Sequence, residues 1–312
     1  MVMQNKTTGN HAARSHKTKK QSKMSFAHIL VICILLLIAA SIVQPMLNLL
    51  ARALSDPTQA FRVKGLDILP QGFSLFHFEV ILSNDLVWIS LRNSLFITIV
   101  GTALSVLLTC SAAYSLTRPE LYGKRVFMYF LIIMMIVIPG MVQEYFLMKN
   151  LDLLDKLWSM VFFKSVSVYY LIILMRFFEE VPQSFVEAAK LDGAGHLTIF
   201  FKIFMPLRKV PVITISMFYF VARWNEFFYS SIFLSSRGNT TLQVLLRKFV
   251  VENDQSNIIG IQNIAANNII AQLDMNAMKS AAIWVTLIPI LLIYPIVLKY
   301  HVGGVLSGGV KE

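Results

Sequence analysis

The chain has 312 residues, of which 56% are hydrophobic and 14% charged, and its formal net charge is +11. Such a long and apolar chain is not typical of a globular domain that folds in water. The excess of Lys and Arg fits loops on the cytoplasmic face of a membrane rather than a nucleic-acid interface, so we expect a lipid bilayer as a partner and no nucleic acid.

Residues 1–25 form a basic tail that we expect to be disordered and cytoplasmic. The apolar run that follows is long enough to cross a bilayer and lacks a small-residue cleavage site. We therefore interpret it as a first membrane span and not as a signal peptide.

Six apolar runs predict an all-α, polytopic membrane protein, because a backbone in lipid must satisfy its own hydrogen bonds. The expected spans are residues 26–50, 92–116, 127–148, 157–178, 211–234 and 281–300. We expect a kink at Pro139 and Gly140 in the third span, and interruptions of the sixth span at Pro289 and Pro295.

Loop charge predicts the orientation of these spans. The N-terminal tail, the loop at residues 117–125 and the segment at residues 180–211 are all basic, and a six-span arrangement places them on one side. The turn at residues 150–156, on the other side, has balanced charges. Positive loops mark the cytoplasmic side, so we expect the N-terminus and the 180–211 segment in the cytoplasm.

The 180–211 segment is built as two short helices joined by a turn. Pro182 suits a first helical turn, and Gly193 and Gly195 suit a left-handed helix end. The apolar positions of the two helices are Phe185, Ala188 and Ala189 in the first, and Leu197, Phe200, Phe201 and Phe204 in the second. We expect Pro206 to stop the second helix. The segment either presents Glu187 and its small neighbours to a partner, or is an ordinary interfacial hairpin.

The same segment resembles the EAA loop of bacterial ABC-import permeases. The family pattern is Glu-Ala-Ala, three residues, Gly, nine residues, Ile, one residue and Leu-Pro. Here it reads Glu187-Ala188-Ala189, Gly193, Ile203 and Met205-Pro206, with Met205 where leucine is usual. The likeness extends over most of the chain and is nearest to the second permease of oligosaccharide importers, in the maltose-type or lipoprotein-dependent polysaccharide branch.

The resemblance implies a type I ABC importer permease fold for residues 26–300 and an ATPase-coupling role for the 180–211 segment. The coupling residues would be Glu187, Ala188, Ala189, Asp192, Gly193, Ala194, Gly195, Ile203 and Pro206. The implied partners are a homologous second permease, two ATPase subunits that bind ATP and Mg, an extracellular or periplasmic sugar-binding protein and an oligosaccharide substrate. The implied location is the inner (plasma) membrane of a bacterial cell.

The fifth span holds polar residues at a depth where they are costly and usually functional. The residues that we expect to line a substrate pathway or gate are Tyr219, Arg223, Trp224, Asn225, Glu226 and Tyr229. Aromatic rings and amide or carboxylate groups are what a sugar pathway needs. The alternative is that Arg223 and Glu226, three apart on a helix, neutralise each other or hold two helices together.

Two long segments lie on the outer side, at residues 51–91 and 235–279. In the second, Leu242, Leu245, Leu246 and Phe249 predict a short helix. These segments form either a packed lid or, as the resemblance implies, a docking surface for the binding protein. Residues 301–312 are a glycine-rich tail, expected to be cytoplasmic and not helical.

The chain has no GxxxxGK[ST] loop, so we do not expect it to be an enzyme or to hydrolyse ATP itself. We also expect no catalytic constellation, no metal site and no cofactor of its own. His196 is interpreted as a polar loop residue and not as a ligand. Two other classes stay open from the residues alone, namely an ion-coupled secondary transporter and a non-transporting membrane scaffold.

Overall fold

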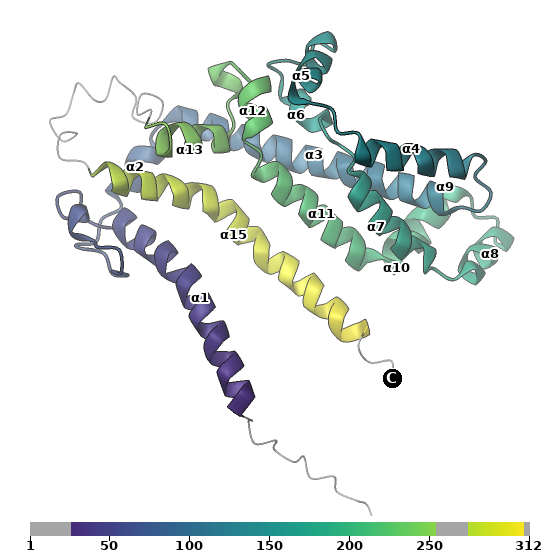
Figure 1. The fold of residues 1–312 in the computed structure, drawn as a ribbon, viewed down its shortest axis with the longest axis horizontal. Coiled ribbons are helices and arrows are strands. Elements are labelled where there is room, and N and C mark those ends of the chain that lie inside the picture. The colour runs from purple at the N-terminus through teal and green to yellow at the C-terminus, as the bar shows by residue number, and fades with distance from the viewer. Residues whose placement is uncertain (1–25, 254–273, 309–312) are drawn as a thin grey trace, which may run out of the picture. The chain divides into compact units, whose positions relative to one another are not determined.

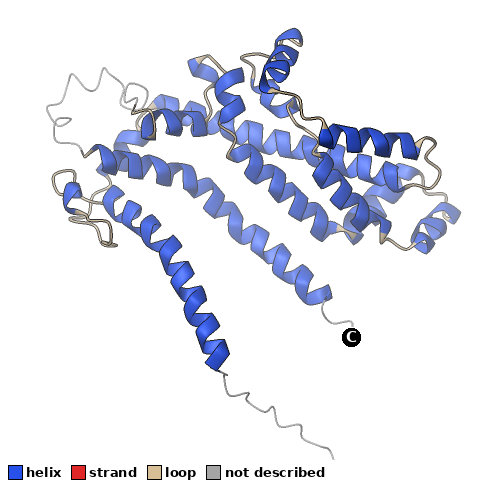
Figure 2. Cartoon of the chain, viewed as in Figure 1, coloured by secondary structure: helices blue, strands red, loops and turns tan. Residues whose placement is uncertain are grey.

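The computed structural model describes residues 26–253 and 274–308, and this part of the chain consists of helices joined by loops (Figure 2). The predicted all-α class is confirmed. The predicted disorder of residues 1–25 concerns residues outside the described ones. The chain divides into two compact units, Met1–Met46 and Leu47–Glu312.

The described part of the first unit is the beginning of helix α1 (Phe26–Ala53). Its side chains from His28 to Val43 are exposed, and residues 28–53 are long and apolar enough to cross a membrane. Pro45 lies within the helix. The expected first span is thus one helix.

In the second unit, helix α3 (Asp85–Thr117) is a central element on which several other helices pack. The Asn84 side chain caps its start by accepting a hydrogen bond from the Leu86 N–H at 2.8 Å. Helices α7 (Val168–Glu179) and α11 (Lys209–Trp224) lie along α3, as Figure 1 shows, and α6 (Leu157–Phe162) also contacts it. The residues expected at the substrate pathway and the residues expected to couple to the ATPase are therefore positioned by the same helix, α3.

Short helices also pack on the long helices of this unit. Helix α2 (Phe76–Leu82) packs on α15 (Met275–Gly308), and α13 (Leu242–Val250) packs on both α3 and α15. The short helix expected from the leucine spacing is confirmed as α13, whose Leu242, Leu245 and Phe249 are buried. A 3-10 turn, η1 (Ala60–Arg62), and another, η3 (Arg237–Asn239), belong to the connecting loops.

The third and fourth expected spans are broken. Helix α4 (Lys124–Ile136) ends before Pro139, and α5 (Met141–Asn150) departs from it at 117°. The kink predicted at Pro139 and Gly140 is confirmed, and it is a break between two helices. Likewise α6 and α7 are separated by residues 163–167, where Lys164 has a positive φ of 48° that interrupts regular helix.

The fifth expected span is also two helices, α11 and α12 (Phe228–Phe233), because Asn225 ends α11. The sixth expected span differs in the opposite way, because it is continuous where interruptions were expected. Pro289 and Pro295 lie inside α15 without dividing it, and the helix continues to Gly308, so a non-helical tail from residue 301 is wrong over the described residues. Extending a formed helix is far easier than nucleating one, which offsets the poor helix propensity of Gly303 and Gly304.

Among the described residues, three helices are long and apolar enough to span a membrane, at residues 28–53, 85–117 and 275–295. The bent α4–α5 pair is a fourth candidate. The expected fourth and fifth spans consist of shorter helices, so the count of six spans stays a prediction.

Candidate functional site

The 180–211 segment folds as the predicted helix–turn–helix. Helix α8 (Gln183–Leu191) has Asp192 as its C-cap, and Gly193, whose φ is +77°, follows it. The Ala194 N–H donates to the Ala189 carbonyl at 2.9 Å, and the Gly193 N–H donates to the Lys190 carbonyl at 3.0 Å. These two bonds form a Schellman motif, which requires the left-handed residue. The role expected for Gly193 is confirmed, whereas Gly195 has a φ of −75° and precedes the next helix.

The second helix runs through Pro206 instead of stopping there. Helix α9 (His196–Ile199) continues into a π-helix, η2 (Phe200–Phe204), and then into α10 (Met205–Leu207). Proline lacks an N–H and its ring pushes away the carbonyl four residues earlier, so the wider π-turn just before Pro206 accommodates it. Arg208, with φ −113° and ψ 31°, separates this helix from α11.

One face of the segment is fastened to the scaffold by aromatic rings. The Tyr114 ring on α3 lies 5.0 Å from Phe204 and 5.4 Å from Phe200, and its hydroxyl is 3.3 Å from Nδ1 of His196. Arg118 lies over the Tyr114 and Phe204 rings, at 4.8 and 4.5 Å. The segment is therefore held by buried apolar and cation–π contacts.

The opposite face is exposed. Glu187, Ala188 and Asp192 are exposed, and Leu191 and Leu197 expose 89% and 75% of their surface. Three other members of the motif, Ala189, Ala194 and Ile203, are half-buried against the core. The segment thus has two sides: one packs against the core, and the other exposes apolar side chains.

Ion pairs flank the segment. Lys190 Nζ lies 2.6 Å from Glu120 Oε1, and Arg208 Nη1 lies 2.9 Å from Glu180 Oε2. The hydrogen bond from Lys190 lowers the pKa of the Glu120 carboxyl. Both pairs are at least partly exposed, so they orient the segment more than they stabilise it.

Arg223, in the last turn of α11, joins three elements. Its guanidinium donates to the carbonyls of Met160 (2.6 Å) and Val161 (3.1 Å) on α6 and to the Ser105 hydroxyl (2.9 Å) on α3. A Cβ at Gly101 would lie 2.6 Å from Arg223 Nη1, so the glycine makes room for the guanidinium. Arg223 therefore links α11 to α6 and α3 by hydrogen bonds, which is the kind of contact that the alternative interpretation expected.

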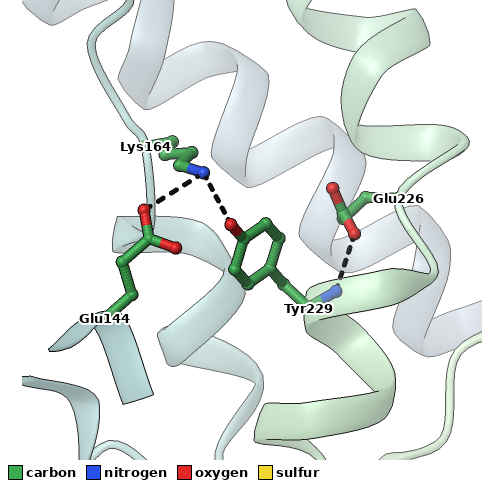
Figure 3. Close-up of polar contacts among 4 residues, drawn as sticks. All are labelled: Glu144, Lys164, Glu226 and Tyr229. Carbon is green, nitrogen blue, oxygen red and sulfur yellow. Dashed lines mark hydrogen bonds and ion pairs between the residues drawn. The ribbon is translucent and has the colours of Figure 1, made fainter. Parts of the chain in front are cut away.

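Glu226 does not neutralise Arg223, because α11 ends between them and the two are not three apart on one helix. Its Oε1 accepts a hydrogen bond from the Tyr229 backbone N–H at 2.8 Å and so caps the start of α12 (Figure 3). Tyr219 is buried, and its hydroxyl lies 2.8 Å from Thr109 Oγ1 and accepts from the Ser167 N–H at 2.8 Å.

A cavity of about 200 Å³ lies beside these residues. Tyr219, Arg223 and Glu226 line it, together with Lys164, Tyr170 and Phe163. The other three residues expected at the pathway are placed elsewhere. Trp224 is buried in the core near Leu242 and Met278, and Asn225 is exposed at the end of α11. Tyr229 does not line the cavity itself but accepts a hydrogen bond from Lys164, which does.

Two residues of this region were missed by the sequence analysis. Lys164 Nζ lies 3.2 Å from Glu144 Oε1 and donates to the Tyr229 hydroxyl at 3.1 Å (Figure 3). Glu144 is only 6% exposed. Both are charges inside expected spans, so the rule that singled out Arg223 and Glu226 would also have found them.

The chain is similar to transport proteins. A family model described as the binding-protein-dependent transport system inner membrane component matches residues 105–305. The polygalacturonan/rhamnogalacturonan transport system permease YtcP of Bacillus subtilis is 34% identical over 283 residues, which cover 91% of this chain and 97% of that protein. The maltodextrin transport system permease MdxG of the same organism is 28% identical, covering 81% and 88% of the two chains.

A solved structure has the same fold. It is a chain of a bacterial ABC transporter involved in the import of the acidic polysaccharide alginate, with a TM-score of 0.80 and 27% identity. The superposition covers 94% of this chain and 99% of that chain. The bent and broken helices described above are therefore compatible with a membrane-embedded permease fold.

Proposed function

The chain belongs to the binding-protein-dependent transport system inner membrane component family, and we propose that it is the permease subunit through which an ATP-driven importer admits oligosaccharides or polysaccharide fragments. Family membership carries this proposal, because permeases named for polygalacturonan and maltodextrin transport are among its relatives. Family membership also argues against the two alternatives that the residues alone left open, an ion-coupled secondary transporter and a non-transporting membrane scaffold.

The exposed face of the 180–211 segment supports docking of an ATPase. Leu191 and Leu197 expose apolar surface beside Glu187 and Ala188, while the aromatic face below them holds the segment to α3. A buried side and an uncovered apolar side are what a helix needs to receive a partner without leaving its own fold. In this proposal ATP and Mg are bound by two partner ATPase subunits, and a second, homologous permease completes the pathway.

A movement of the 180–211 segment would be transmitted along the chain to α11. The segment runs through α10 and Arg208 into α11, and α11 carries Arg223 at its far end, fastened to α6 and α3. A displacement of the segment by the ATPases would therefore reach the cavity through a packed helix. The continuous contacts from the segment to the cavity support this route of coupling.

The docking test compares two exposed leucines. Leu191→Ser removes apolar surface from the 180–211 segment, and Leu66→Ser does the same at an equally exposed position in the loop after α1, where Leu66 is 83% exposed. We expect Leu191→Ser to lose its ATPase subunit during purification and to lose oligosaccharide uptake, while Leu66→Ser keeps the ATPase. Normal ATPase retention and uptake in Leu191→Ser would refute the docking surface.

The proposed orientation has the N-terminus in the cytoplasm of a bacterial cell. Basic residues in the tail and in the 180–211 segment support it. Single cysteines at Ser15 and Asn253, in a background without Cys33 and Cys110, should react with an impermeant thiol reagent from opposite sides. The outer loops would then face the proposed sugar-binding protein.

A further inference from the structure

The cavity between α3, α7 and α11 contains two cations that are used in different ways. Arg223 donates to two carbonyls and one hydroxyl, and its guanidinium is held between α3 and α6. Lys164 lies on the irregular linker between α6 and α7, and its side chain is 56% exposed. Lys164 is therefore the cation that a molecule in the cavity can reach.

The Lys164 ammonium has a donor to spare. It makes an ion pair with Glu144 and a hydrogen bond to the Tyr229 hydroxyl, as Figure 3 shows, whereas an ammonium has three donors. The Phe163 and Tyr229 rings lie 4.7 and 4.2 Å from Nζ and limit its position. A third acceptor could thus bind Lys164 without dismantling this arrangement.

The unused donor of Lys164 favours an anionic acceptor. Lys164, Arg223 and Glu226 line the cavity, and Glu144 pairs with Lys164 at 3.2 Å, so two cations and two carboxylates lie at or beside it. Glu226 already caps α12 through one oxygen. A carboxylate that entered the cavity would meet Lys164 as a charge-assisted donor, which is a stronger interaction than a hydrogen bond between neutral groups.

The remaining lining suits one sugar ring. Tyr170, Phe163 and Tyr219 supply aromatic surface, and Ser167 and Glu226 are polar residues among the lining groups. The volume of about 200 Å³ is below the roughly 300–1,000 Å³ of pockets for drug-sized ligands, so the cavity would take a single residue of a saccharide chain.

We propose that this cavity is a subsite for a uronate unit, whose carboxylate binds Lys164 beside or in place of Glu144, so that the importer selects acidic saccharides. The inference rests on the proposed import function and adds the substrate class. It assigns Lys164 as the residue that distinguishes a uronate from the corresponding neutral sugar.

The test uses matched acidic and neutral probes. Oligogalacturonates and alginate oligomers would be compared with their carboxyl-reduced forms, which keep the linkages and lose the charge. The readout is the concentration that half-maximally stimulates ATP hydrolysis by the reconstituted importer with its binding protein. The binding protein is the same in every assay, so a change in the acidic-to-neutral ratio between variants originates in this chain.

We expect Lys164→Met to raise the half-maximal concentration for the acidic probe about tenfold and to change that for the reduced probe less than twofold. Lys164→Arg should retain most of the preference, because it keeps the cation. Lys156→Met is the matched control, since Lys156 is exposed and does not line the cavity. Equal shifts for both probes in Lys164→Met would overturn the inference and leave Lys164 a structural latch.

Glu144→Gln provides a change in the opposite direction. It removes the carboxylate that competes for Lys164 while keeping the size of the side chain, so the half-maximal concentration for the acidic probe should fall. An unchanged or raised value would count against the subsite.

A wild-type importer stimulated only by reduced probes would overturn this inference and leave the proposed function standing. One stimulated by no saccharide would overturn both.

Discussion

The two ends of α11 use polar and apolar residues in opposite ways. At its start, the 180–211 segment buries aromatic rings against Tyr114 and exposes Leu191 and Leu197. At its end, Arg223 and Glu226 bond inside the chain, to carbonyls, a hydroxyl and a helix N-terminus, although the buried Arg223 Nε has no partner. The first end has a surface that another protein can cover, whereas the second makes its polar contacts within the chain beside a small cavity.

Motif residues and buried charges therefore carry different kinds of information. The Glu187–Pro206 spacing describes a surface, and a substitution there should change binding to a partner. Arg223 is an internal connection, and a substitution there should change the fold first. The following changes test that division, from the largest expected effect to the smallest.

Replacing Arg223 should have the largest effect. Arg223→Met removes the Arg223 donor from the Met160 carbonyl and one of the two side-chain donors from the Val161 carbonyl, which also accepts from the Ser165 hydroxyl, and a buried unsatisfied group costs about 1–3 kcal/mol. We expect a lower melting temperature in detergent and a lower yield of assembled complex. Arg176→Met, at a residue whose side chain is 76% exposed, is the matched control and should change little. Normal stability with lost transport would instead assign Arg223 to the pathway.

Gly101→Ala sharpens the same prediction. The new Cβ would lie 2.6 Å from Arg223 Nη1, so the guanidinium must move away from its acceptors. We expect Gly101→Ala to destabilise the protein by part of the Arg223→Met effect. In the double variant the two effects should be less than additive, because both remove the same contacts. Additive losses of melting temperature would show that Gly101 packs for another reason.

Gly193→Val should separate binding from folding. Valine at a φ of +77° is strained by roughly 1–2 kcal/mol per residue, and the Schellman motif would open. We expect a folded, membrane-inserted subunit that no longer retains its ATPase. Gly65→Val is the matched control, because Gly65 lies outside the 180–211 segment, has no positive φ and has open space around its Cβ position. Retained ATPase and normal uptake in Gly193→Val would contradict the prediction.

Asn225→Ala should have a smaller effect, on transport alone. Asn225 is exposed at the end of α11, so its truncation strands no buried partner and complex yield should be normal. If Asn225 faces the pathway completed by the second permease, uptake and sugar-stimulated ATP hydrolysis per complex should fall several-fold. A lower yield with unchanged normalised activities would make the residue structural.

The Glu120–Lys190 pair should have the smallest effect. Because Lys190 lowers the pKa of Glu120 below its ordinary value of 4.5, any stability from the pair is present above that value and is lost as the pH falls through the lowered pKa. Glu120→Gln should therefore change the melting temperature slightly at neutral pH and low salt, and not at all in acid. An effect that persists in acid or in high salt would show a role beyond charge.

Local sequence was enough for several features of the site. Gly193 was predicted to be left-handed because a helical run ends there, and α13 was predicted from leucines at helical spacing; both are confirmed. The kink of the third span was predicted from Pro139 and Gly140, but the residues that break the fourth and fifth spans were harder to identify. A strongly apolar run looks continuous whether its helix is straight or broken, because hydropathy reports burial in lipid and not backbone direction.

Composition and fixed spacing are properties of the chain alone, so they were enough to predict the all-α membrane class, the position of the 180–211 segment and the transport family of the chain. The tertiary structure decided the partners of each polar group. Arg223 and Glu226 are close in sequence, yet one bonds to α3 and α6 and the other caps α12. Lys164 and Glu144 are distant in sequence and form an ion pair. Such choices depend on which helices approach one another, and side-chain contacts between distant residues exist only after the chain has packed.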